Sequence, residues 1–178
     1  MNQDEKIPYF EYFIKLLVDW HSEKAGTETN DLSTLKVLKL LFFASAVNTK
    51  ANSEDTLLDT VFDKYYAMPY GHVESDIYSS IRNNNFTNIT VNNRNSTITP
   101  NSNIELPSPK LKIDIDKAIE SLKTSNPNII LASSFELVDL SHSWYSWQYY
   151  YNLAKKQGLN SIHIPVSEIK EEEKIFML

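Results

Sequence analysis

The sequence predicts a mainly helical α+β fold, and three observations point to it. The stretch 37–47 is apolar almost without interruption, which is typical of a helix at the centre of a core. Several other segments repeat apolar residues at the three- and four-residue spacing of one helix face. Strand signals are confined to an asparagine-rich stretch and a few short runs. We therefore expect a single domain over residues 1–178, built around a central helix at about 31–48, with a small β-hairpin near 89–99.

The N-terminal segment predicts a first amphipathic helix before the central one. Pro8 suits the start of this helix and Gly26 suits its end. Its apolar stripe comprises Phe10, Phe13, Ile14, Leu17 and Val18, and continues to Trp20 and His21. After a polar link, Asp31 is a suitable N-cap for the central helix.

The segment between residues 56 and 82 contains a short ambiguous run and an aromatic turn. Residues 56–62 fit either a short strand or one helical turn. Pro69 and Gly71 predict a turn, and the i, i+4, i+8 spacing of Val73, Ile77 and Ile81 predicts a helix after it. The turn carries Tyr65, Tyr66, Met68 and Tyr70. It is either a recognition loop or a hydrophobic closure of the core.

An asparagine-rich segment at 83–110 is expected to form a hairpin or an exposed flap. Residues 83–103 hold nine asparagines, which favour turns because they tolerate left-handed backbone. The most regular part predicts strands at 89–91 and 97–99, joined by a turn at 92–95.

The C-terminal third predicts further helices. A stripe of Ile115, Ala118, Ile119 and Leu122 gives one, with Asp114 or Asp116 at its start. Pro127 fits the first turn of a second helix, which carries apolar residues to 141, and an aromatic helix follows at 144–156. Residues 162–164 fit a short edge strand before Pro165, and residues 167–174 fit a final helix or tail.

Charge and composition exclude several classes of partner. The net charge is -6 and only two arginines are present, so phosphate-led binding of nucleic acid is disfavoured. There are no cysteines, which excludes disulfides and zinc–thiolate sites and suits a cytoplasmic protein. The N-terminus lacks a signal-peptide core, and no apolar run is long enough to span a membrane.

Candidate catalytic residues are few. Asp139 and His142 are three residues apart and share a helix face beside Ser141. A serine hydrolase, however, needs its serine on a strained turn such as G-x-S-x-G, and the three glycines at 26, 71 and 158 form no such turn. The four histidines are isolated, and no phosphate-binding loop is present. We expect no catalytic residue, no metal site and no cofactor. A small hydrolase that uses His142 is the weaker alternative.

Six aromatic residues lie between 144 and 151, too many for one side of a helix. Trp144, Trp147 and Tyr151 are spaced as a buried stripe, which leaves Tyr145, Tyr149 and Tyr150 more exposed. Exposed tyrosines are favoured anchors of protein interfaces. Core packing and a binding face therefore both remain possible roles for this cluster.

Three motifs in this order resemble the Panacea domain family, which includes SocA-like antitoxins and GepA-like phage-associated proteins. The first motif is Lys36 with the run Leu38–Ala44. The second is Gly71–His72–Val73 with Tyr78 downstream, and the third is Ser141–His142 with Trp147. His72 stands where the family often has proline. Without the proline ring to fix the backbone, the turn is expected to be looser or to suit a different partner.

The resemblance implies a protein-binding antitoxin of a toxin–antitoxin system. Such proteins neutralise a toxin from a neighbouring gene, and SocA-like members deliver the toxin to an AAA+ protease. Both mechanisms need an adaptor surface and no catalytic residue. The partner-binding candidates are Tyr66, Tyr70, His72, His142, Tyr145, Tyr149 and Tyr150. The alternative is a phage- or prophage-encoded protein that binds a host factor, and the oligomeric state is left open.

Overall fold

Helix α2 (Thr34–Ala46) lies at the centre of the fold. The structure is a computed structural model, which describes residues 1–177. Every residue of α2 from Lys36 to Ala46 is buried. The helix packs against strand β2 (Gly71–Glu74) and helices α3 (Leu57–Thr60), α5 (Pro109–Ser125) and α6 (Ser134–His142). The predicted mainly helical α+β class, with an apolar helix at its centre, is confirmed.

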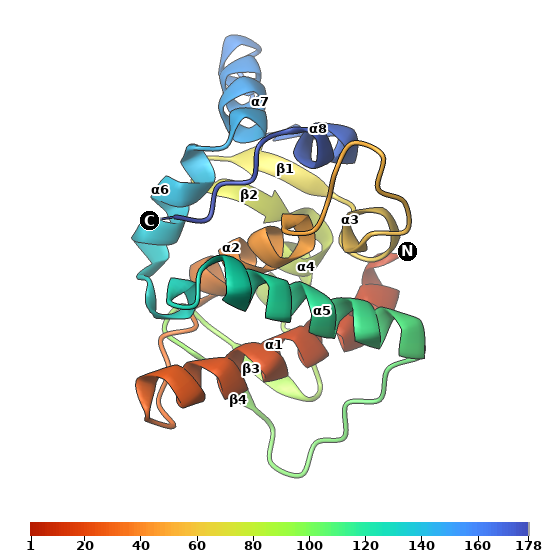
Figure 1. The fold of residues 1–178 in the computed structure, drawn as a ribbon, viewed down its shortest axis with the longest axis vertical. Coiled ribbons are helices and arrows are strands. Elements are labelled where there is room, and N and C mark those ends of the chain that lie inside the picture. Colours follow the sequence, from red (N-terminus) through yellow and green to blue (C-terminus); the bar gives the residue numbers. More distant parts are fainter. Residues whose placement is uncertain (178) are drawn as a thin grey trace.

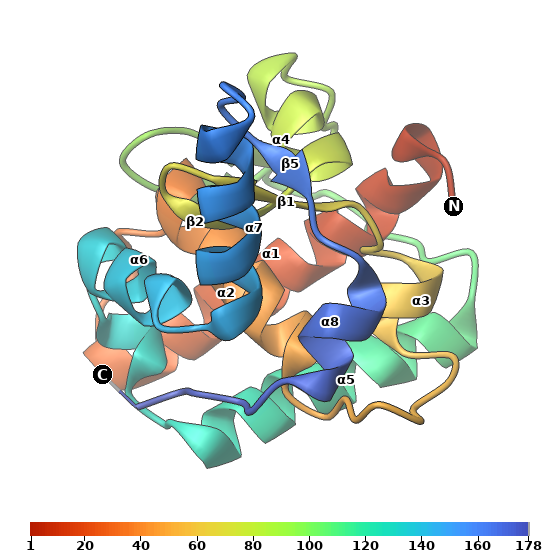
Figure 2. The same ribbon diagram turned by 90° about the horizontal axis from the view of Figure 1, so that it is seen from above.

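Other helices cover α2 on several sides (Figure 1, Figure 2). The remaining ones within residues 1–177 are α1 (Gln3–Ala25), α4 (Ser75–Arg82), α7 (Tyr145–Lys156) and α8 (Val166–Glu171), with a 3-10 turn, η1 (Ile129–Leu131). In the described part of the chain, no helix has the length and apolarity needed to cross a bilayer.

Several predicted helix starts were wrong, because side-chain caps decide them. Helix α1 begins at Gln3, where Asn2 and Glu5 form a capping box, and Pro8 lies inside the helix. Helix α2 is capped by Ser33, while Asp31 instead pairs with the Lys36 ammonium at 2.6 Å.

The next two starts fail for the same reason. Helix α5 begins at Pro109 with Ser108 as its cap, well before the expected Asp114 or Asp116. The single helix expected from Pro127 is divided into η1 and α6, because Ser133 forms a new capping box with Glu136.

A small antiparallel sheet stands where an aromatic turn was predicted. Strand β1 (Tyr65–Met68) pairs with β2, so that Tyr65 lies opposite Glu74. Strand β5 (Ile162–His163) adds to the other side of β1, which gives the order β2-β1-β5 and confirms the predicted edge strand. Val73 is therefore a strand residue, and the following helix begins only at Ser75. The ambiguous run at 56–62 contains the helical turn α3.

The asparagine-rich segment contains the predicted hairpin. Strands β3 (Ile89–Val91) and β4 (Ser96–Ile98) are antiparallel and lie within the expected limits. A carboxylate on α1 holds the hairpin: Glu11 Oε1 accepts hydrogen bonds from the backbone N–H groups of Thr87 and Asn88, at 2.9 and 2.8 Å. The hairpin is thus fastened to the body of the protein.

Helix α7 leaves the body of the molecule, whereas the chain after α8 returns to it. Helix α7 contacts β1, β5 and α6, and its far end projects at the top of Figure 1. Near the C-terminus, the buried Phe176 ring packs edge-on against Trp144, with ring centroids 5.8 Å apart. The start of α7 is therefore anchored in the core.

Candidate functional site

A chain of polar groups, buried except for the partly exposed Glu172, links β2, α6, α7 and the C-terminal segment. His72 lies at its centre: Nδ1 is 2.9 Å from the Ser141 hydroxyl, and Nε2 is 2.8 Å from the Ser146 hydroxyl. Ser146 Oγ also donates to a Glu172 carboxylate oxygen. The His72 backbone N–H donates to Ser141 Oγ at 3.0 Å. Four segments that are far apart in the sequence are thus joined around one imidazole.

One arrangement of protons satisfies every group in this chain while Glu172 stays ionised. Ser141 donates to Nδ1 of a neutral imidazole, Nε2–H donates to Ser146, and Ser146 donates to Glu172. Burial holds the pKa of His72 well below its usual value, and the charges of Lys39 and His142 act in the same direction. The imidazole is therefore neutral in the folded protein.

The histidine and the two serines of the polar chain are sealed from solvent, so His72 is not part of any surface. The side chains of His72, Ser141 and Ser146 are at most 1% exposed. The Phe42 ring stacks on the imidazole at 3.7 Å. Because His72 is buried, the expectation that it contacts a partner is wrong. The looser turn expected in the absence of proline is not found either, because the hydrogen bonds of the imidazole to Ser141 and Ser146 hold the turn in place.

Lys39 is a second buried group beside His72. Its side chain is fully buried on α2, and its ammonium donates to the His72 carbonyl oxygen. Burial lowers the pKa of Lys39 to about 7. A lysine with this pKa changes its charge near neutral pH, so the stability of the fold becomes pH-dependent.

The Lys39→Met variant is expected to be at least as stable as the wild-type chain at pH 7, because methionine fills similar space without a charge to bury. The folded protein, with a Lys39 pKa of about 7, releases a proton that the unfolded chain retains as the pH rises. The free energy of unfolding of the wild-type chain should therefore rise by about 2 kcal/mol from about pH 7 to pH 9, and the variant should lack this rise. Urea unfolding at both pH values measures the difference. Equal pH dependence in the two proteins would contradict a depressed Lys39 pKa.

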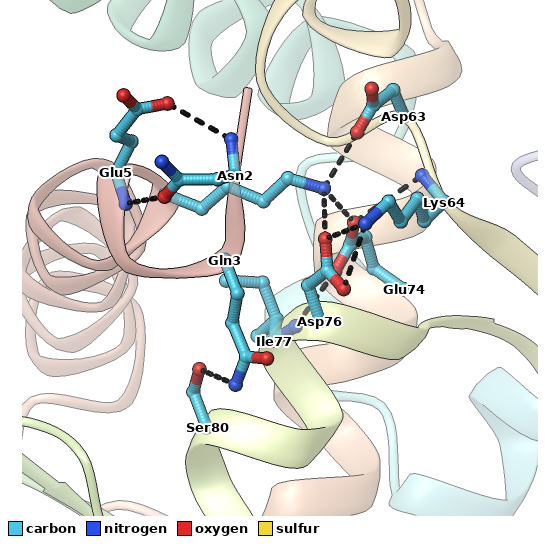
Figure 3. A network of polar contacts seen from close by, with 10 residues as sticks. Asn2, Gln3, Glu5, Asp63, Lys64, Glu74, Asp76, Ile77 and Ser80 are labelled. Carbon is cyan, nitrogen blue, oxygen red and sulfur yellow. Dashed lines mark hydrogen bonds and ion pairs between the residues drawn. The ribbon is translucent and has the colours of Figure 1, made fainter.

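Three carboxylates converge beside the start of α4 (Figure 3). One oxygen each from Asp63, Glu74 and Asp76 lies within 4.8 Å of the others, a grouping that could hold a cation. The buried Lys6 ammonium of α1 occupies that position, at 2.6, 2.6 and 2.8 Å from the three carboxylates. Burial acts to lower the pKa of Lys6, but the charge of Glu74 and the hydrogen bonds to all three acids raise it above its usual value. Lys6 is therefore the resident counter-charge of this cluster.

The exposed tyrosines of α7 form the candidate interaction surface. Tyr145 and Tyr149 are 63% and 49% exposed, and their rings stack with centroids 5.9 Å apart. Tyr150 is half-buried and meets Tyr149 edge-on at 5.1 Å. A groove of about 340 Å³ runs along this side of the helix and is lined by Tyr145, Gln148, Tyr149, Asn152, Leu153 and Lys156. We call this the α7 groove.

The other candidates lie outside the α7 groove. Tyr70 is 57% exposed and pairs with Phe135 of α6, with ring centroids 6.5 Å apart. His142 stacks on Trp147 at 3.7 Å and is half-buried. Tyr66 packs edge-on against His163. The seven candidates are thus distributed over several places.

Phe135 is an exposed aromatic residue that the sequence reasoning missed. The residue is 66% exposed, which among the large apolar residues of 1–177 is second only to Met177. A signal was available, because position 135 lies off the buried stripe formed by Leu137, Val138 and Ser141. With Tyr70 it makes a second aromatic patch.

The sequence of this chain matches the model of a known protein family. Residues 37–148 match the family model described as antitoxin SocA-like, Panacea domain, which is more than half of the chain. The chain belongs to the SocA-like Panacea family. No curated protein and no solved structure matches it.

The Panacea match extends from α2 to the first turn of α7. Of the two lysines of the first motif, it includes Lys39, whereas Lys36 lies one residue before it. In this Panacea domain neither lysine faces solvent: Lys36 pairs with Asp31, and Lys39 bonds to the His72 carbonyl. The motif lysines are therefore structural. Lys6 and Tyr149 both lie outside the matched residues, whereas Tyr145 lies inside them.

Proposed function

We propose that this Panacea protein is a non-enzymatic antitoxin that binds a cognate toxin encoded by a neighbouring gene through the α7 groove. Membership in an antitoxin-like family supports the general role. The main support for placing the binding site on α7 is its pair of stacked, half-exposed tyrosines, since this helix projects from the body of the protein. Tyrosine supplies a large contact area with little entropy to lose, which makes it a frequent anchor of protein interfaces.

The burial of the Ser141–His72 pair supports binding over hydrolysis. A catalytic serine must reach a substrate carbonyl and lie beside an oxyanion hole. Ser141 is fully buried, and its hydroxyl already bonds to both the ring and the backbone of His72. This serine and histidine act as a fastening between β2 and α6.

Binding at the α7 groove is compatible with both mechanisms open to a Panacea antitoxin. The bound toxin is either inhibited in the complex or delivered to an AAA+ protease. The two differ in the lifetime of the toxin, since delivery shortens its half-life in cells and inhibition does not. Both begin with the same contact, so the surface can be tested first.

The double variant Tyr145→Ala/Tyr149→Ala is expected to lose neutralisation of the neighbouring gene product. Truncating the two interface anchors should weaken binding by at least about 30-fold, because the loss of even one hot-spot side chain costs about 2 kcal/mol or more. Growth rescue on co-expression and copurification of the two proteins measure this loss.

Ile113→Ala on α5 is the matched control, since Ile113 is 51% exposed and lies on a different helix. This control should neutralise as well as the wild-type chain. Full rescue by the tyrosine double variant, or a harmless neighbour that does not copurify with the wild-type protein, would contradict the proposal.

A further inference from the structure

Helix α7 differs in charge from the other exposed helices. It carries Lys155 and Lys156 in its last turn and contains no Asp or Glu. Among the α-helices of residues 1–177, only α2 shares this lack of acidic residues, and α2 is buried. The chain as a whole has a net charge of -6. The projecting helix is therefore a locally positive element on an acidic protein.

The polar groups lining the α7 groove are suited to acidic side chains. The lining combines the rings and hydroxyls of Tyr145 and Tyr149 with the Lys156 ammonium, and it contains no carboxylate. Glu172, the carboxylate bonded to the helix, accepts from Ser146, which is buried. Tyrosine hydroxyls, side-chain amides and a lysine can all donate hydrogen bonds to a partner's carboxylates.

We propose that the α7 groove binds an acidic helical segment of the partner protein, an inference that rests on the proposed function. A helix laid beside α7 would pack apolar side chains on the tyrosine rings and Leu153, with carboxylates toward Lys156. Charge complementarity selects this occupant, since opposite charges across an interface steer association and exclude wrong partners.

Two other occupants fit the surface less well. A second copy of the chain placed symmetrically on α7 would set Lys155 and Lys156 against another α7 helix, which carries no carboxylate to pair with them. Nucleic acid requires several clustered cations, whereas this helix has two lysines and no arginine on a protein of net charge -6. The acidic protein segment remains the favoured occupant.

The test measures binding of two probes to the full chain by fluorescence anisotropy. One probe is the labelled product of the neighbouring gene. The other is a synthetic amphipathic helix with leucine on one face and glutamate elsewhere, compared with its lysine-for-glutamate counterpart. The variants are Lys156→Glu in the groove, Tyr145→Ala/Tyr149→Ala, and Lys24→Glu on the exposed end of α1 as the matched charge control.

Lys156→Glu is expected to weaken binding of the neighbour product by about tenfold or more, and added salt should weaken wild-type binding. Lys24→Glu should change binding by less than about twofold. The glutamate helix should bind the wild-type chain and be lost in the tyrosine variant, whereas the lysine helix should not bind.

Each remaining outcome separates the two proposals. If the neighbour product binds all variants equally, the α7 groove is not the binding site, but the proposal that the protein is a toxin-binding antitoxin still stands. If only the glutamate helix binds, the groove assignment survives and the cognate-toxin proposal does not. Preference for the lysine helix or for nucleic acid, or a wild-type dimer that the tyrosine variant dissociates, overturns the acidic occupant. Failure of both probes to bind overturns both proposals.

Discussion

Replacing Lys6 by methionine is expected to cost about 3–5 kcal/mol of folding free energy, because it leaves buried carboxylates without their counter-charge. Glu74 is fully buried and depends on the Lys6 ammonium at 2.6 Å, while Asp63 and Asp76 share the same ammonium. The cation of Lys64 lies 3.0 Å from Asp76 and is too exposed to replace Lys6. Urea unfolding at neutral pH measures the loss.

The loss should shrink as the pH falls. Burial already raises the pKa of Glu74, and Lys6 opposes that rise. Without Lys6 the folded-state pKa of Glu74 rises further, so protonation favours the folded variant and its deficit narrows on acidification. Lys15→Met on the same helix is the control, because its pair with Asp19 is exposed and should contribute less than about 1 kcal/mol. If the two substitutions lowered the free energy of unfolding equally, the buried cluster would contribute no more to stability than an exposed ion pair.

Gly71→Ala is the second substitution with a large expected effect, a loss of about 2–5 kcal/mol from backbone strain and overpacking together. Gly71 has a φ of +94°, which disfavours any residue with a Cβ. An added Cβ would also lie 2.4 Å from the Ser141 hydroxyl and 2.8 Å from its Cβ. Because Ser141 is fixed between the ring and the backbone of His72, it cannot move aside without breaking the polar chain.

Gly26→Ala separates strain from clash. Gly26 also has a positive φ, of +65°, but nothing lies within 4 Å of an added Cβ. This control should lose only the strain of a left-handed backbone, about 1–2 kcal/mol, so the excess at Gly71 reports the contact with Ser141 together with the greater strain of its larger φ. Thermal unfolding of both variants measures the two terms. A Gly71→Ala variant no less stable than the control would show that Ser141 yields easily.

Sequence patterns predicted those parts of the fold that depend on local periodicity. The apolar run of α2, the stripe of α5 and the aromatic helix at 145–156 each carry their own helical signal. The β3–β4 hairpin was marked by asparagine turns. In the aromatic segment 144–151, the spacing of the rings also separated the exposed Tyr145 and Tyr149 from the buried Trp144.

The features that were missed depend on partners distant in the sequence. The strands of the β1–β2 hairpin are too short for a clear alternating pattern, and the sheet is completed by β5, about ninety residues later. A lysine in the sequence predicts a solvated charge, so the burial of Lys6 and Lys39 becomes visible only with their partners in place. His72 was predicted to contact a partner protein because the two serines that bond to its ring, Ser141 and Ser146, lie on other elements about seventy residues away.

A calorimetric titration of the purified chain with the product of the neighbouring gene shows whether this protein acts by binding. A protein that acts by binding should give a saturable complex of fixed stoichiometry, and the tyrosine double variant should lose binding and growth rescue together. Rescue by wild-type protein that forms no complex with the toxin, or rescue retained when the complex is lost, would contradict the account.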